Sequence, residues 1–207
     1  MSNRLALQLL PILEGIIKDS DDEMEMAVRL AIIGNVIDFG IFKDVDIKGE
    51  VEGFLFFGLS IDDFDKFCTK VVQNDRILYI LDNAGEIVFD RLLIGELIKR
   101  GKEVTAVVRG GPVLNDVTMA DADDTGLLNL CQVVDNGSDC VGTVLEECSP
   151  GFVNAYYDFP FVISKGQANY ETLIGSRKDI AFLFMAKCEV VAGHLSVPEK
   201  GMILKVL

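Results

Sequence analysis

Residues 76 to 86 read RILYILDNAGE and contain the transition around which the fold is organised. The apolar run at 77–81 predicts a buried strand, and the polar DNAGE segment that follows predicts a turn from this strand into a helix. In an open α/β sheet, ligands bind outside the carboxyl ends of the strands. We therefore expect Asp82 and Asn83 to lie at a ligand site, where they would hold a divalent metal ion.

Downstream of this strand, apolar β-rich runs alternate with amphipathic stretches. A helix is expected from Glu86 to about Arg100, with Gly101 as its end. Short connections between strands and helices predict a three-layer α/β/α fold, with a mostly parallel, Rossmann-like sheet covered on both faces. The expected strands are 77–81, 103–108, 131–134, 161–164, 180–185 and 202–206.

The first third of the chain has helical patterns instead. Leucine and isoleucine recur at helical spacing over 4–18, where Pro11 should kink or delay the helix. The segment 20–23 (SDDE) has the form of a capping box that opens a second helix, and 60–63 (SIDD) predicts the start of a third. These patterns predict an N-terminal helical subdomain.

The composition predicts one compact unit, with a helical cap over 1–74 and an α/β domain over 75–207. A chain of 207 residues, half of them hydrophobic, is long enough for one sizeable core. Acidic residues outnumber basic residues by 33 to 19, which gives a formal charge of −14 and would repel a phosphate backbone. We therefore expect no nucleic-acid partner.

The cysteine and histidine content limits the possible metal sites. The five cysteines are odd in number and no two are spaced as CxxC, so neither a disulfide framework nor a zinc cluster is expected. The single histidine, His194, excludes a histidine-rich site, and oxygen ligands favour Mg²⁺ or Mn²⁺ over Zn²⁺. No apolar run approaches the roughly 20 residues of a membrane span, so we expect a cytoplasmic protein without a membrane partner.

A second polar pair follows the second strand. The exit of strand 103–108 reads RGGPVLNDVT, and the interval from Asp82 to Asp116 is 34 residues, about the length of one βαβ unit. Neighbouring parallel strands would bring both acids to the same edge of the sheet. Two carboxylates and the amide oxygen of Asn83 would then form a site for a hard cation.

Each polar pair also has a purely structural interpretation. Asn83 would cap the following helix with Glu86 as its partner, and Asn115-Asp116 would cap another helix. The glycines at 110–111 would only make a tight turn. These interpretations are plausible for each motif alone and less plausible for both motifs together.

Two further strand exits carry groups suited to an anion. Lys165 follows the predicted strand 161–164 and precedes a glycine, so it is placed to meet a phosphate; the alternative is a solvated surface lysine. After the strand 131–134, Gly137 and Ser138 would either donate backbone hydrogen bonds to an anion or make the turn, which is slightly favoured. The predicted substrate- and phosphate-binding residues are Lys165, Gly166, Asn169, Gly137, Ser138, Asn35 and Glu86.

Four segments, in this order, resemble the motifs of the metal-dependent damage-control phosphatases. This family was long known only as a domain of unknown function and includes the phosphatase domain fused to some pantothenate kinases. The resemblance covers roughly 24–190 and extends to 34–38 (GNVID) in the helical part. The four segments are DNAGE (82–86), GGPVLNDVT (110–118), GSD (137–139) and SKGQANYE (164–171).

The resemblance implies an α/β/α sheet with a helical cap and a divalent ion, most of all Mn²⁺, with Ni²⁺, Co²⁺ or Mg²⁺ as alternatives. It assigns Asp82, Asn83 and Asp116 to the metal and Lys165 to the substrate phosphate, so that Asp82, Asp116 and Lys165 form the catalytic set. Members hydrolyse phosphomonoesters of small metabolites, and the branch that this chain resembles is associated with damaged nucleotides or their precursors. Relatives in that branch begin with a helical CxxC segment, which this chain lacks; either the chain is truncated or its gene is short.

The expected reaction is metal-assisted hydrolysis, with a water molecule or one of the two aspartates as the attacking group. A haloacid-dehalogenase-type phosphatase is disfavoured, because that family requires a second acid where this chain has Ala84. The remaining alternative is a non-catalytic module that binds nucleotides or sugar phosphates and has a vestigial metal site. Dinucleotide binding is weakly supported, because no GxGxxG motif follows the first strand.

Overall fold

The computed structural model describes residues 2–35, 49, 51, 53, 55–56 and 58–207. Residues 36 to 38 of the GNVID segment lie outside this described part. Within this part, the sheet has seven strands in the order β1-β7-β6-β5-β2-β3-β4. The strands are β1 (Ile61–Asp62), β2 (Arg76–Ile80), β3 (Glu103–Val108), β4 (Gln132–Asp135), β5 (Phe161–Lys165), β6 (Ile180–Met185) and β7 (Met202–Val206).

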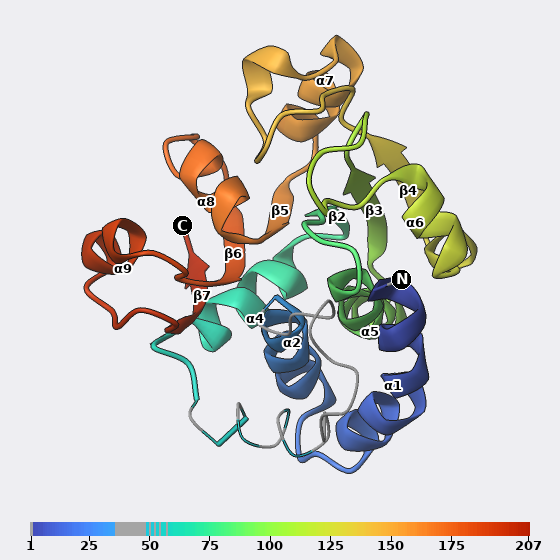
Figure 1. Cartoon of the computed structure of the whole chain (residues 1–207), viewed down its shortest axis with the longest axis vertical. Coiled ribbons are helices and arrows are strands. Elements are labelled where there is room, and N and C mark those ends of the chain that lie inside the picture. The colour runs from blue at the N-terminus through green and yellow to red at the C-terminus, as the bar shows by residue number, and fades with distance from the viewer. Residues whose placement is uncertain (1, 36–48, 50, 52, 54, 57) are drawn as a thin grey trace.

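The helices connect these strands and cover both faces of the sheet (Figure 1). None of those in the described ranges is long and apolar enough to cross a membrane. The α-helices are α1 (Ser2–Lys18), α2 (Glu23–Gly34), α4 (Phe64–Gln73), α5 (Glu86–Lys99), α6 (Met119–Asp124), α7 (Pro150–Asp158), α8 (Gln167–Leu173) and α9 (Glu189–Leu195). Two short 3-10 helices are η1 (Leu127–Asn129) and η2 (Leu145–Glu147).

The sheet is mostly parallel, as the sequence predicted. β2 pairs in parallel with β3 on one side and with β5 on the other, and β4 and β6 extend the parallel set. Among the strands of the described residues, the pairing of β7 with β6 is the antiparallel one. The exits of β2, β3, β5 and β6 therefore lie at the same edge of the sheet.

Alternate side chains of the strands β2 to β7 pack into two separate apolar clusters. In β2, Tyr79 belongs to the cluster formed with α1, α2, α4, α5 and α6, whereas Leu78 and Ile80 belong to the cluster formed with α7, α8 and α9. This alternation follows from the two-residue period of a strand. The predicted three-layer α/β/α architecture is confirmed, with helices on both faces of a buried sheet.

Several element boundaries differ from the predicted ones. α1 continues through Pro11, and the N-cap of α2 is Asp22, whose carboxylate accepts from the amides of Met24 and Glu25. α4 begins at Phe64 rather than near residue 60, because Ile61 and Asp62 pair with β7 as a short edge strand. Two residues are too few for a recognisable strand pattern. The boundary proposed at residue 74 stays a prediction.

A close contact between α2 and α5 brings the end of α2 to the exit of β2. A Cβ atom on Gly34 would lie 2.9 Å from the Cβ of Phe89, so only glycine allows the two helices to approach this closely. The residue after Gly34 is Asn35, and its side chain reaches Asp82 and Glu86. The helical layer thus contributes directly to the edge of the sheet where the predicted ligands lie.

Candidate active site

The exits of β2 and β3 pair with each other beyond the sheet. The amide of Val117 donates to the carbonyl of Asp82 at 2.9 Å, and Asn83 forms an isolated antiparallel bridge with Asp116. The amide of Ala84 donates to the carbonyl of Asn115 at 2.8 Å. The structure therefore brings Asp82, Asn83 and Asp116 together.

Neither polar pair caps a helix. The N-cap of α5 is Gly85, with a φ of 87° and no side-chain hydrogen bond, and α6 begins after a capping box between Thr118 and Asp121. The capping interpretations of Asn83 and of Asn115-Asp116 are therefore wrong. Their side chains are available for other partners.

The side-chain amide of Asn83 has a defined orientation. Its Nδ2 donates to Asp82 Oδ2 at 2.5 Å and to Glu86 Oε2 at 3.2 Å. Both hydrogen bonds are donated by the NH₂ group, which places this group on the side of the two carboxyl groups. The carbonyl oxygen Oδ1 of Asn83 then points away from both carboxylates.

Each of the three predicted metal ligands retains one oxygen that accepts no hydrogen bond from a described residue. Oδ2 of Asp82 accepts from Asn83 and Asn35, and Oδ2 of Asp116 accepts from Arg109 Nε at 2.6 Å. The remaining oxygens are Oδ1 of Asp82, Asn83 and Asp116. Two carboxylate oxygens and an amide oxygen are the donors that a hard cation such as Mg²⁺ or Mn²⁺ prefers.

This set contains only two acidic side chains. Within the described ranges, no three acidic, histidine or cysteine residues converge on a metal position. An amide oxygen supplies the third protein ligand of the proposed set, and small hard cations commonly keep several water ligands. The composition of the set therefore fits a divalent ion that also contacts water and substrate.

The charge around the site also fits a divalent ion. The buried carboxyl groups of Asp82, Glu86, Asp90 and Asp116 face two buried cations, which leaves two negative charges in excess when all are ionised. The cations are Arg109 and Lys165. Burial, together with Glu86 and Asp116, raises the pKa of Asp82 to about 8. A divalent cation would balance the excess charge.

Lys165 is fully buried, and its ammonium group uses all three donors inside the protein. Nζ donates to Glu86 Oε1 at 2.6 Å, to Asp90 Oδ1 at 2.7 Å and to the carbonyl of Ala31 at 2.7 Å. Burial alone would lower the pKa of this ammonium group, but Asp90 and Glu86 outweigh burial and raise the pKa. The direct contact with phosphate that the sequence predicted would require breaking this arrangement.

Two other residues of the predicted phosphate-binding set also serve the protein interior. Asn169 donates to the carbonyls of Lys165 and Leu81 and accepts from Arg109, which joins β5, β2 and β3. Gly166 has a φ of 82°, and a Cβ atom there would overlap the carboxylate of Asp82. These residues position the site rather than offer a free group to a ligand.

The Gly137-Ser138 segment forms a turn, which is the alternative that the sequence slightly favoured. The amide of Gly137 donates to Asp135 Oδ1 and the amide of Ser138 donates to Asn136 Oδ1, both at 3.0 Å. The same oxygen of Asn136 accepts from the amide of Gly110. These amides are therefore engaged within the loops and are not aimed at an anion.

A match to a family model covers residues 1 to 203 and carries the description "Damage-control phosphatase ARMT1-like domain". The chain belongs to this family. It is 36% identical over 212 residues to a damage-control phosphatase of Archaeoglobus fulgidus, covering 100% of this chain and 73% of that protein. It is 40% identical over 184 residues to a damage-control phosphatase of Pyrococcus horikoshii, covering 87% of this chain and 64% of that protein.

The fold of this damage-control phosphatase domain is shared with a solved relative. The crystal structure of a DUF89 family protein from Pyrococcus horikoshii is similar to it with a TM-score of 0.92 and 36% identity, over 99% of this chain and 72% of that chain. The chain is thus shorter than each of these relatives. The resemblance inferred from the four sequence motifs is confirmed.

Sequence reasoning missed three charged residues of this family member. Arg109 directly follows β3 and donates to Asp116, Thr143 and Asn169. Asp90 lies one helical turn after Glu86 on α5 and is fully buried. A charged residue on the apolar stripe of a predicted helix, or at the end of an apolar strand, is the signal that would have identified both residues.

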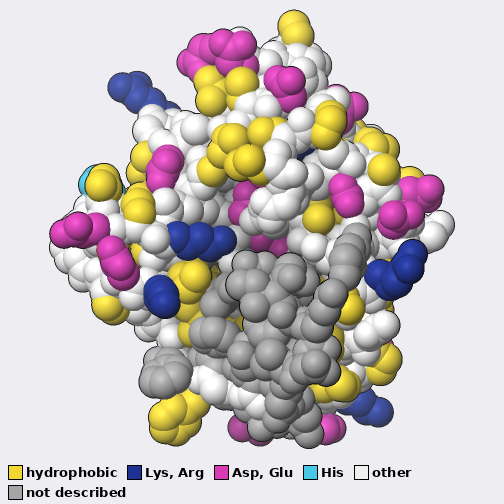
Figure 2. All heavy atoms as spheres, in the orientation of Figure 1, with side chains coloured by type: hydrophobic (Ala, Val, Ile, Leu, Met, Phe, Trp, Pro, Cys, Tyr) yellow, Lys and Arg dark blue, Asp and Glu magenta, His cyan; other side chains and the backbone are white. Residues whose placement is uncertain are grey.

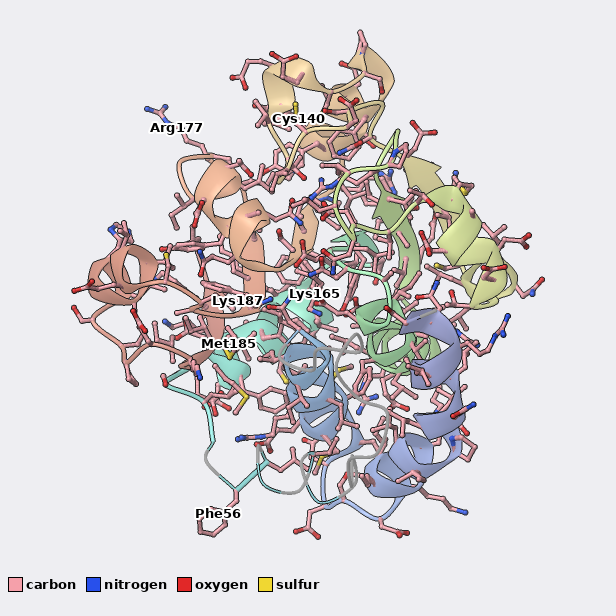
Figure 3. All side chains as sticks on the ribbon, in the orientation of Figure 1. Phe56, Cys140, Lys165, Arg177, Met185 and Lys187 are labelled. Carbon is pink, nitrogen blue, oxygen red and sulfur yellow. The ribbon has the colours of Figure 1, made fainter. Side chains whose placement is uncertain are left out.

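The third missed residue is Lys187, two positions after β6. Figure 2 shows acidic side chains in a hollow near the centre of this face, with a basic side chain beside them. In Figure 3, Lys187 points from the end of β6 toward the centre, where Lys165 is labelled. Burial raises the pKa of Asp82, and the charge of Lys187 acts in the opposite direction and lowers it.

Proposed function

We propose that the chain is a metal-dependent phosphatase that hydrolyses phosphomonoesters of small metabolites. The abnormal or oxidised nucleotides, their precursors and sugar phosphates are the proposed substrates. The observation that carries this proposal is the set of three oxygens, on Asp82, Asn83 and Asp116, that remain available at one acidic sheet edge. Membership of the damage-control phosphatase family supports the reaction class.

Asp82, Asn83 and Asp116 would hold the metal, with Mn²⁺ as the first choice and Ni²⁺, Co²⁺ or Mg²⁺ as alternatives. A divalent ion bound there would offset the charge on the phosphoryl oxygens and make a bound water more acidic. Hydrogen bonds within the protein orient two of these metal ligands, Asp82 and Asp116. Arg109 fixes one oxygen of Asp116, and the amide groups of Asn35 and Asn83 fix one oxygen of Asp82.

The phosphate of the substrate requires a cation whose donors are not already used. Lys165 donates to three protein acceptors, and Arg109 donates to Asp116, Thr143 and Asn169. Lys187 is exposed, and its ammonium group has no hydrogen bond or ion pair with any residue in the described ranges. We therefore assign the phosphate contact to Lys187 and an internal role to Lys165.

The backbone of Lys187 is held in place although its side chain is free. Its amide donates to Gln167 Oε1 at 2.6 Å, which ties the exit of β6 to the first turn of α8. The side chain of Lys187 can then extend toward Asp82 from a backbone position that is held in place. A lysine ammonium suits this role because it acts as a point charge on a phosphate.

The test is hydrolysis of an aryl phosphate with Mn²⁺ by Asp82→Ala and Asp116→Ala. Each substitution should reduce kcat/KM at least about 100-fold, because it removes a charged ligand of the reacting centre. Asp158→Ala is the matched control, since this exposed aspartate pairs with Arg76 at the opposite edge of the sheet. Circular dichroism should show that all three variants are folded.

Two results would contradict the proposal. Full activity in Asp82→Ala or in Asp116→Ala would remove the substituted residue from the metal site. Tight Mn²⁺-dependent binding of phosphorylated nucleosides or sugars without turnover by the unaltered chain would instead support the non-catalytic module. A panel of phosphorylated metabolites, assayed with Mn²⁺, Ni²⁺, Co²⁺ and Mg²⁺, would then identify the substrate class and the metal.

A further inference from the structure

A continuous chain of buried hydrogen bonds leads from the middle of β2 to the proposed metal site. Tyr79 Oη and Lys165 Nζ both donate to Asp90 Oδ1 at 2.7 Å. Lys165 Nζ also donates to Glu86 Oε1 at 2.6 Å, and Oε2 of Glu86 accepts from Asn83. We infer that Tyr79 and Asp90 are positioning residues, which act through Lys165 and Glu86 to orient the metal-binding oxygen of Asn83. This inference rests on the proposed metal site.

The chain of contacts cannot act by touching substrate. The exposed fractions of Tyr79, Asp90 and Lys165 are 0%, and that of Glu86 is 1%. The effect of Tyr79 and Asp90 on the reaction must therefore pass through the residues between them and the ligands.

Stability alone does not account for these buried charges. Taking a lysine and two carboxyl groups out of water is costly, and well-packed apolar residues of similar volume are often as stable or more stable. The neighbouring positions on α5 are apolar and buried, including Ile87, Val88 and Phe89. Glu86 and Asp90 interrupt this apolar surface at the two positions that reach Lys165.

The geometry explains why both carboxyl groups are needed. Three acceptors on two different helices hold the three donors of Lys165: Ala31 on α2, and Glu86 and Asp90 on α5 at a spacing of one turn. This leaves the ammonium group no freedom to rotate. Glu86 is then fixed through Oε1, and its Oε2 accepts from the amide groups of Asn35 at 2.8 Å and Asn83 at 3.2 Å.

Tyr79 has a specific place in this arrangement. Oδ1 of Asp90 accepts both hydrogen bonds, whereas Oδ2 is buried without a partner in the described structure. Among the described residues, Tyr79 and Lys165 supply the hydrogen bonds that orient the carboxyl group of Asp90. Tyr79 lies on β2 and Asp90 on α5, so their contact ties together both elements that flank the loop carrying Asp82 and Asn83.

The test compares Tyr79→Phe with Tyr156→Phe. Tyr156 is a matched control, because it is equally buried and donates or accepts one hydrogen bond, with Ser176, on the other face of the sheet. The measurement is the Kd of Mn²⁺ by isothermal titration in the absence of substrate. We expect Tyr79→Phe to weaken Mn²⁺ binding about fivefold and Tyr156→Phe to leave it unchanged.

A second variant and a second measurement cover the case in which one variant fails to fold or the chain binds no metal. Asp90→Asn should weaken Mn²⁺ binding about tenfold or more, and high Mn²⁺ should restore most of kcat in both variants. In the metal-free protein, the NMR signals of the Asn83 side-chain NH₂ group should shift in Tyr79→Phe and not in Tyr156→Phe.

An equal Kd and unchanged Asn83 signals in folded Tyr79→Phe or Asp90→Asn would overturn the inference. Absence of Mn²⁺ binding by the unaltered chain, with the Asn83 signals still displaced in Tyr79→Phe, would overturn the proposed metal site while retaining the positioning contact.

Discussion

Two lysines emerge from neighbouring parallel strands, yet their surroundings are opposite. Lys165 ends β5, is fully buried and donates to three protein acceptors. Lys187 follows β6, is exposed, and its ammonium group contacts no acceptor among the described residues. A lysine at a strand exit can therefore serve either the protein or its ligand, and the number of internal acceptors distinguishes the two cases.

The largest expected difference between the two lysines is in folding stability. Lys165→Met leaves Glu86 and Asp90 buried without their cation, which should lower the free energy of unfolding by about 3–5 kcal/mol. Lys187→Met changes an exposed side chain and should alter the free energy of unfolding by less than about 0.5 kcal/mol. Urea denaturation of the metal-free variants measures both values. Equal, small losses would show that the buried contacts of Lys165 contribute nothing to the folded state.

The next largest difference is in substrate binding. Lys187→Met should raise KM for an aryl phosphate about tenfold or more, because a hydrogen bond to a charged phosphate is lost, and should weaken inhibition by inorganic phosphate to a similar extent. Lys66→Met is the matched control, since Lys66 is an exposed lysine on α4 that pairs with Asp63, the N-cap residue of this helix. An unchanged KM and an unchanged phosphate inhibition constant would remove Lys187 from the substrate site.

The fold was largely predictable because the sheet is buried on both faces. Each long strand is a run of apolar residues, and such runs are visible without knowledge of the partner strands. The strand β1 was missed because it has two residues and derives its structure from pairing with β7. The start of α4 was misplaced for the same reason.

The site was predictable only in part, because its residues come from separate elements. The interval between Asp82 and Asp116 indicates that two strand exits meet, which the structure shows through their backbone pairing. The sequence cannot show that the donors of Lys165 are occupied, because the acceptors come from α2 and α5. The role of Arg109 likewise depends on contacts with residues 7 to 60 positions away in the chain.

The smallest expected effect concerns the pH dependence of the buried contacts of Lys165. Burial raises the pKa of Asp90 to about 7, against the lowering effect of Lys165, whereas an ordinary aspartate has a pKa of 3.8. Between these values the folded protein retains a proton that the unfolded chain has lost. The contribution of Asp90 to the stability of the folded protein is fully present below about pH 4 and is lost as the pH rises through about 7.

Asp90→Asn should therefore remove part of the fall in stability with rising pH. The difference in slope from the unaltered chain should be about 1 kcal/mol per pH unit between pH 6 and pH 7, measured by urea denaturation in EDTA. Lys187→Met should leave the pH dependence that Asp90 contributes unchanged, because Lys187 does not contact Asp90. Lys165→Met should shift this pH dependence to higher pH, because it removes the cation that favours the ionised carboxylate of Asp90. A slope in Asp90→Asn equal to that of the unaltered chain would mean that Asp90 is ionised in the folded protein, and Lys165 would then bridge two carboxylates rather than one carboxylate and one neutral acid.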